Sequence, residues 1–160
     1  MNYLNTIHPE ETDPVLVSLS MRAKRDGVPV LSGEGLRFLR QILTMIDAKR
    51  VLEIGSATGF SAIAMAKHSP GAEITTVERD AEMAVEARMN IRDAGLEDRI
   101  RLIEDDAFNI DPEALDGPFD LVFIDGAKSQ SVPFFKKFSP HVEIGGAVMV
   151  DNLMFHGLVG

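Results

Sequence analysis

The sequence has 160 residues, of which 45% are hydrophobic and 26% are charged; this balance indicates one globular domain and excludes a disordered or fibrous chain. The absence of cysteine excludes disulfides, thiolate metal sites and cysteine nucleophiles. The net charge of -9 repels phosphate backbones and argues against a general nucleic-acid binder. No apolar run is long enough to span a bilayer, and residues 1–14 do not resemble a signal peptide, so we expect a cytoplasmic protein with no membrane partner.

The N-terminal part of the chain, residues 1–48, is expected to form a helical cover. Within it, residues 33–47 predict a helix packed on a sheet, because the apolar side chains recur at helical spacing. Two short segments, 21–27 and 134–138, concentrate positive charge. A solvated helix face is favoured over a basic patch for both of them.

From residue 49 onward, short β-branched runs alternate with helical patterns, which is typical of a parallel sheet with crossover helices. The expected strands are 50–55, 73–78, 99–104, 119–125 and 146–152. The expected helices are 61–68, 80–95 with Asp80 as cap and Gly95 as stop, a short turn at 111–115, and 131–138, which Pro133 disfavours. The sequence therefore predicts a single α/β domain with helices on both faces of a mainly parallel sheet.

Three loops that follow strands predict a site for an adenosine-bearing ligand, because ligands bind beyond the carboxyl ends of such strands. The first loop, "EIGSATGFS", contains Gly55 and exposes backbone amides, but it lacks the G-x-G-x-x-G fingerprint. Glu78 ends the second strand, where it can accept hydrogen bonds from a ribose or stand beside the helix cap. In the third loop, Asp106 can receive an exocyclic amine and the amide of Ala107 can meet a ring nitrogen.

The ends of the fourth and fifth expected strands predict a metal site. Asp125 and Asp151 occupy these ends, and neighbouring strands lie ~4.8 Å apart, so two carboxylates can reach one ion. Asn152 would add a third oxygen, and an all-oxygen set selects Mg²⁺, Mn²⁺ or Ca²⁺. The alternative is a helix cap and a turn. Lys128, three residues after Asp125, is close enough to take a proton or orient an oxyanion, or else is a surface lysine.

The stretches "VLEIGSATGFSAIAMA", "VERD", "DDAF", "FDLVFIDGAKSQ" and "GGAVMVDNLMFHGLV" resemble the divalent-metal-dependent O-methyltransferases of the catechol and caffeoyl-CoA type, which use S-adenosylmethionine. The resemblance runs from about Val30 to the last residue. It implies a Rossmann-like class I methyltransferase fold. The positions that match the family's cofactor-binding residues are Glu53, Gly55 and Ser61 around the methionine part, Glu78 at the ribose, and Asp106 and Ala107 at the adenine. Asp125, Asp151 and Asn152 match its metal ligands, and Lys128 matches its active-site lysine.

Within that family, "IDGAKSQ" and "DNLMFHGLV" look most like the bacterial branch that methylates 5-hydroxyuridine in tRNA. A 5-hydroxyuracil carries two oxygens on neighbouring carbons, as a catechol does, so either pair can chelate one cation. The resemblance therefore implies tRNA as the acceptor, with a small catechol-like phenol or a truncated cofactor-binding domain as the alternatives. Family members usually continue as a helix and two strands, so we expect a sheet without its last strands. A homodimer is a further expectation.

Overall fold

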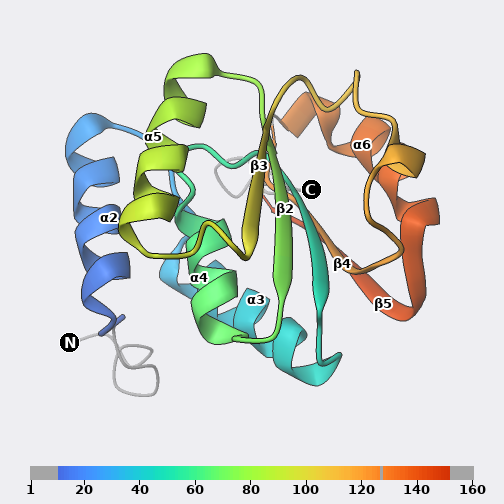
Figure 1. The fold of residues 1–160 in the computed structure, drawn as a ribbon, viewed down its shortest axis with the longest axis horizontal. Helices are drawn as coiled ribbons and strands as arrows, with labels where there is room; N and C mark the ends of the chain where they lie inside the picture. Colours follow the sequence, from blue (N-terminus) through green and yellow to red (C-terminus); the bar gives the residue numbers. More distant parts are fainter. Residues whose placement is uncertain (1–10, 127, 152–160) are drawn as a thin grey trace, which may run out of the picture.

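A five-stranded parallel sheet forms the centre of the part of the chain that this computed structural model describes, residues 11–126 and 128–151 (Figure 1). Its strands are β1 (Arg50–Ile54), β2 (Glu73–Glu78), β3 (Ile100–Glu104), β4 (Phe119–Ile124) and β5 (Val142–Val150), in the order β3-β2-β1-β4-β5. The chain starts at the middle strand, builds outward to β3, and then crosses back to β4. The order therefore reverses between β1 and β4, where open α/β sheets bind ligands.

The carboxyl ends of the strands lie level with one another. Ile54 pairs in register with Val77 of β2 on one side and with Ile124 of β4 on the other. Ile124 in turn pairs with Val150 of β5. The loops that follow these strands therefore meet at one edge of the sheet.

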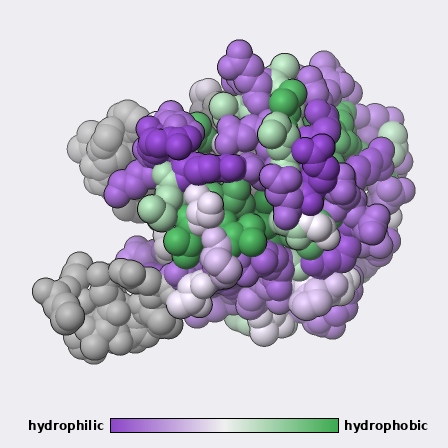
Figure 2. All heavy atoms as spheres, turned by 60° about the vertical axis from the view of Figure 1, so that its left-hand side comes forward, coloured by the Kyte–Doolittle hydropathy of each residue, from purple (hydrophilic) through white to green (hydrophobic). Residues whose placement is uncertain are grey.

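Helices cover both faces of the sheet, as expected. In the described residues they are α2 (Pro14–Asp26), α3 (Gly33–Met45), α4 (Phe60–His68), α5 (Ala81–Asp93) and α6 (Ser131–Phe138), with 3₁₀ turns η1 (Pro112–Ala114), η2 (Lys128–Gln130) and η3 (Ser139–His141). Helices α2 to α5 lie on one side of the sheet and α6 on the other (Figure 1). None of these helices is long and apolar enough to cross a membrane. Hydrophilic side chains cover most of the face in Figure 2, with apolar ones gathered in a central area.

The strands are buried on both faces, which explains their continuous apolar runs. In β4, Leu121 and Phe123 belong to the core beneath α2 to α5, whereas Val122 and Ile124 belong to the core beneath α6. All four side chains are completely buried. Because successive side chains of β4 point to opposite faces of the sheet, this one strand contributes to both hydrophobic cores.

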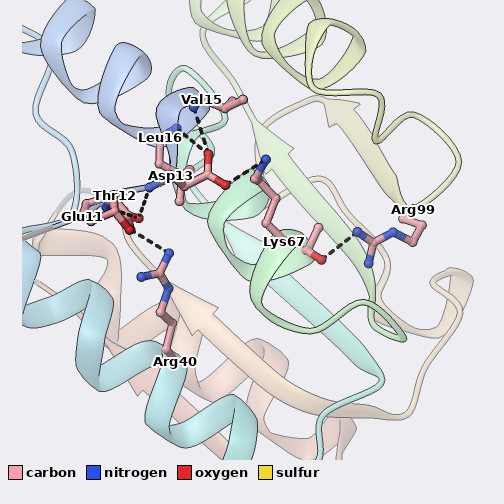
Figure 3. A network of polar contacts seen from close by, with 9 residues as sticks. Glu11, Thr12, Asp13, Val15, Leu16, Arg40, Lys67 and Arg99 are labelled. Carbon is pink, nitrogen blue, oxygen red and sulfur yellow. Dashed lines mark hydrogen bonds and ion pairs between the residues drawn. The ribbon is translucent and has the colours of Figure 1, made fainter.

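Helix α2 is tied to the rest of the fold at its N-terminal end by a polar network (Figure 3). Asp13 caps the helix by accepting hydrogen bonds from the first-turn amides, and its other oxygen lies 3.0 Å from Nζ of Lys67 in α4. Glu11 pairs with Arg40 of α3 at 2.7 Å. The first contact thus ties α2 to α4, and the second ties the segment before α2 to α3.

The structure confirms two of the expected helical segments and corrects the bounds of one expected strand. The segment 21–27, for which a solvated helix face is favoured, is helical up to Asp26 and forms the end of α2. The ends of this helix, which Asp13, Pro14 and the left-handed Gly27 mark, were not predicted. The expected strand 146–152 is wrong at both ends, because β5 runs from Val142 to Val150. Its pairing with β4 is irregular between Phe119 and Leu121. Two glycines within β5 interrupt the run of β-forming residues from which the strand was predicted. The expected helix 131–138 is confirmed as α6: Pro133, which disfavoured it, is the third helical residue and needs no intrahelical amide partner.

Arg99 directly precedes β3 and offers a test of what stabilises the end of the sheet where the strands begin. Its guanidinium donates hydrogen bonds to the carbonyl oxygens of Ala66, Ser69, Pro70 and Ala72. We expect Arg99→Ala to lower the free energy of unfolding by about 2 to 3 kcal/mol, because it leaves carbonyls at the end of α4 without a charged donor. Arg101→Ala is the control: Arg101 makes an exposed pair with Asp116 and should cost less than about 1 kcal/mol. Equal losses in urea unfolding would contradict this role.

Candidate functional site

A cavity of about 450 Å³ opens at the carboxyl edge of the sheet. The loops after all five strands contribute to its wall, and residues 29–31, between α2 and α3, line it as well. Six of the residues predicted from the sequence line this one cavity: Gly55, Glu78, Asp106, Ala107, Asp125 and Asp151. The parallel register thus brings together side chains that are far apart in the sequence.

The carboxylate of Glu78 is fixed by two backbone amides. Its Oε2 accepts a hydrogen bond of 2.7 Å from the amide of Ala57, and its Oε1 accepts one of 2.9 Å from the amide of Asp80. Each carboxylate oxygen can accept more than one hydrogen bond. Glu78 therefore joins the first loop to the start of α5 and still has acceptor capacity on the cavity.

The loop of residues 55–59, here called the glycine loop, passes very close to the end of β4. Gly55 has a φ of 95°, and a Cβ on it would lie 2.4 Å from the carbonyl oxygen of Asp125. Gly59 has a φ of 82° and packs against Ala87 of α5. Only glycine fits at residue 55. The glycine loop and the end of β4, where the metal site is predicted, therefore lie side by side in the wall of the cavity.

The third loop supplies Asp106 and the buried Ala107. Oδ1 of Asp106 accepts a hydrogen bond of 2.9 Å from the amide of Phe108, and its Oδ2 lies 3.8 Å from Nη1 of Arg79. Arg79 also lines the cavity, and the sequence reading missed it. Its position directly after Glu78, in a loop that follows a strand, was the signal in the sequence that could have placed it at the site.

Asp125 and Asp151 stand at matching positions on neighbouring strands. Each donates its amide to the ladder: Asp125 to the carbonyl of Ile54 at 2.9 Å, and Asp151 to that of Ile124 at 3.0 Å. Both residues are half-buried and line the cavity. Two hard oxygen donors fixed at one edge suit a divalent cation such as Mg²⁺.

The remaining members of the predicted metal and catalytic set stay predictions. No group of three or more histidine, cysteine, aspartate or glutamate residues able to hold a metal occurs in the described part of the chain. Asn152, the expected third ligand, lies outside the described residues. Lys128 begins η2, whose last residue, Gln130, lines the cavity.

Glu53 and Ser61, predicted to lie around the methionine part of a cofactor, are not among the residues that line the cavity. Both are buried, and Glu53 accepts hydrogen bonds from the hydroxyls of Ser61 and Thr76. Burial raises the pKa of Glu53 to about 7, and the negative charges of Asp125 and Glu78 act in the same direction against the two hydrogen bonds. Direct contact of Glu53 or Ser61 with a cofactor stays a prediction.

The comparison with protein families settles the class of this fold. Residues 14–160 match the family described as O-methyltransferase. The chain belongs to the O-methyltransferase family. The family resemblance stated above is confirmed at this level, while the branch that modifies tRNA is not shown.

Two curated relatives are similar over most of this chain. One is a catechol O-methyltransferase from Mycobacterium tuberculosis, 33% identical over 91% of this chain and 67% of that protein. Another is a caffeoyl-CoA O-methyltransferase from Populus kitakamiensis, 34% identical over 83% of this chain and 58% of that protein. The chain thus spans between about three fifths and two thirds of the length of these two relatives.

A solved structure extends the comparison to the cofactor. An O-methyltransferase from Streptomyces achromogenes involved in tomaymycin synthesis, solved in complex with S-adenosylmethionine, superposes with a TM-score of 0.83 at 26% identity, over 97% of this chain and 72% of that one. The expected class I methyltransferase fold is confirmed, and so is the expected enzyme class, an S-adenosylmethionine-dependent O-methyltransferase.

The raised pKa of Glu53 predicts a pH-dependent stability. The unfolded side chain titrates near 4.5 and the folded one at about 7, so the native state binds the proton more tightly and loses stability as the pH rises through this range. Relative to Glu53→Gln, the wild type should lose about 3 kcal/mol of unfolding free energy between about pH 4 and about pH 8. Urea unfolding of both proteins at several pH values measures this difference. A difference that stays constant across the range would contradict the raised pKa.

Proposed function

We propose that the protein is a divalent-metal-assisted O-methyltransferase that transfers the methyl group of S-adenosylmethionine to a small catechol-like phenol. The observation that supports this most directly is the placing of Asp125 and Asp151 on the same cavity as Glu78 and Asp106. One cavity thus carries both the predicted metal edge and the predicted nucleoside-binding side chains. The names of the relatives supply the acceptor class.

On the cofactor side, the residues of this chain would bind and orient. Glu78, already held by two amides, would accept hydrogen bonds from the ribose hydroxyls. Asp106 would accept a hydrogen bond from the exocyclic amine of the adenine, and the backbone amide of Ala107 would donate one to a ring nitrogen. S-adenosylmethionine supplies a methyl group on a positively charged sulfur.

On the acceptor side, Asp125 and Asp151 would hold the cation, with Asn152 as the third ligand. A divalent cation held there would supply positive charge that lowers the pKa of the acceptor hydroxyl. Lys128 would take up the released proton or steady the oxyanion. The cavity walls would hold the oxygen in line with the methyl group, which is the main entropic contribution to such a transfer.

The described charges favour a small acceptor over tRNA. Six carboxylates and one arginine line the cavity, which repels a phosphate backbone. The two basic segments are partly engaged elsewhere: Arg22 lies 3.8 Å from Glu86, Arg25 pairs with Asp26, and Lys137 donates to a backbone carbonyl. 5-Hydroxyuridine in tRNA offers the same pair of oxygens and is the second acceptor to be tested.

The cofactor role of Glu78 is testable by binding alone. We expect Glu78→Gln to weaken binding of S-adenosylmethionine by about ten- to a hundredfold, because a carboxamide cannot accept from both amides and the ribose together. Glu82→Gln, on the exposed first turn of α5, makes the same charge change and should leave the affinity unchanged. Isothermal titration calorimetry compares the two variants. Equal affinities would exclude Glu78 from the binding site.

The whole proposal is testable by methyl transfer from labelled S-adenosylmethionine. We expect a catechol to be methylated with Mg²⁺ but not with chelator, and Asp151→Ala to reduce the rate by about a hundredfold or more. Asp116→Ala is the matched control, since Asp116 lies at the opposite end of the strands, beside Arg50 and Glu73. Transfer that ignores both chelator and Asp151→Ala would overturn the metal role. Transfer to 5-hydroxyuridine-containing tRNA instead, weakening steeply with salt, would overturn the small acceptor.

A further inference from the structure

Asn90 connects the N-terminal helices to the glycine loop. It lies on α5 and is 4% exposed. Its Nδ2 donates a hydrogen bond of 2.8 Å to the carbonyl oxygen of Thr58, in the middle of the glycine loop. Its Oδ1 accepts a hydrogen bond from Nη2 of Arg22 in α2. A single buried side chain therefore contacts both the glycine loop and helix α2.

The glycine loop needs such support because of Ala57. This residue has a φ of 43°, in the left-handed region that favours glycine. A residue in that conformation persists only where the surroundings hold it. The amide of Gly59 donates to the carbonyl of Ser56 across the turn, and two hydrogen bonds to side chains add to it. The amide of Ala57 donates to Glu78, and the carbonyl of the next residue, Thr58, accepts from Asn90.

We propose that Asn90 is a positioning residue that holds the glycine loop in its binding conformation, and that Arg22 supports it from α2. Asn90 does not line the cavity and so would not touch the cofactor itself. It would act through Thr58 and Ala57 on the amide that orients Glu78. Its loss would therefore raise the dissociation constant and the KM for S-adenosylmethionine while leaving kcat nearly unchanged.

This inference rests on the proposed use of the cavity for S-adenosylmethionine, and the first test is Asn90→Asp. The aspartate has the same shape and can still accept from Arg22, but it cannot donate to the carbonyl of Thr58. We expect binding of S-adenosylmethionine to weaken by about tenfold, the size of effect of one lost buried hydrogen bond. Calorimetric titration and the split between KM and kcat measure the effect.

A second substitution separates positioning from a general loss of stability. In an Ala57→Gly background the loop adopts φ near 43° without strain, so Asn90→Asp should then weaken binding by less than about threefold. A purely structural role for Asn90 would give the same loss with alanine or glycine at residue 57. That result would overturn the inference.

A third variant keeps the test decisive if Asn90→Asp does not fold. Arg22→Met removes the donor on the α2 side and should weaken binding by a few-fold. Arg25→Met is its control, because Arg25 lies on the same helix and pairs with its exposed neighbour Asp26. Equal affinities of these two variants would overturn the role of Arg22. If the wild type bound no S-adenosylmethionine, the proposed function would fail, whereas normal binding by Asn90→Asp would overturn only this inference.

Discussion

The site depends on the close approach between the glycine loop and the end of β4. A Cβ at residue 55 would lie 2.4 Å from the carbonyl oxygen of Asp125, so the two segments can meet only because Gly55 has no side chain. The approach is fixed from both sides, since Gly55 donates to Val77 of β2 and Asp125 donates to Ile54 of β1. The loops after β1 and β4, where the strand order reverses, therefore form one continuous wall of the cavity.

The charges on that wall explain what kind of ligand it can accept. Carboxylates follow β2, β3, β4 and β5, and Glu53 lies buried beneath them with its pKa raised to about 7 by burial. Bringing negative groups this close is unfavourable unless something positive joins them. A sulfonium cofactor and a divalent cation are both positive. The electrostatics of these residues thus agree with the family to which the chain belongs, and they support the proposal of a small acceptor over a polyanion.

The sequence predicted best those features that local patterns determine. Each of the central strands is a β-branched run, and an acidic residue directly after or at the end of the run, as with Glu78 and Asp125, could be placed on the carboxyl edge without coordinates. The start of β5 could not be placed, because Gly145 and Gly146 break the pattern within a continuous strand. Residues 29–31 and Asn90 were missed for another reason: they act through tertiary contacts that no spacing reveals.

The N-terminal helix α2 supports the site, although the cavity is lined by the segment that follows it, residues 29–31, and not by α2 itself. The glycine loop leads into α4, and the loop after β2 leads into α5, so these two helices fix the loops that orient Glu78. Helix α2 binds both of them, through Asp13 to Lys67 and through Arg22 to Asn90, and the segment after it lines the cavity. A displacement of α2 would therefore alter the carboxyl edge of the sheet in two ways. It would shift residues 29–31, which line the cavity, and it would shift α4 and α5, which hold the loops after β1 and β2. This makes the packing of α2 an energetic component of ligand binding, although α2 contributes no residue to the predicted chemistry.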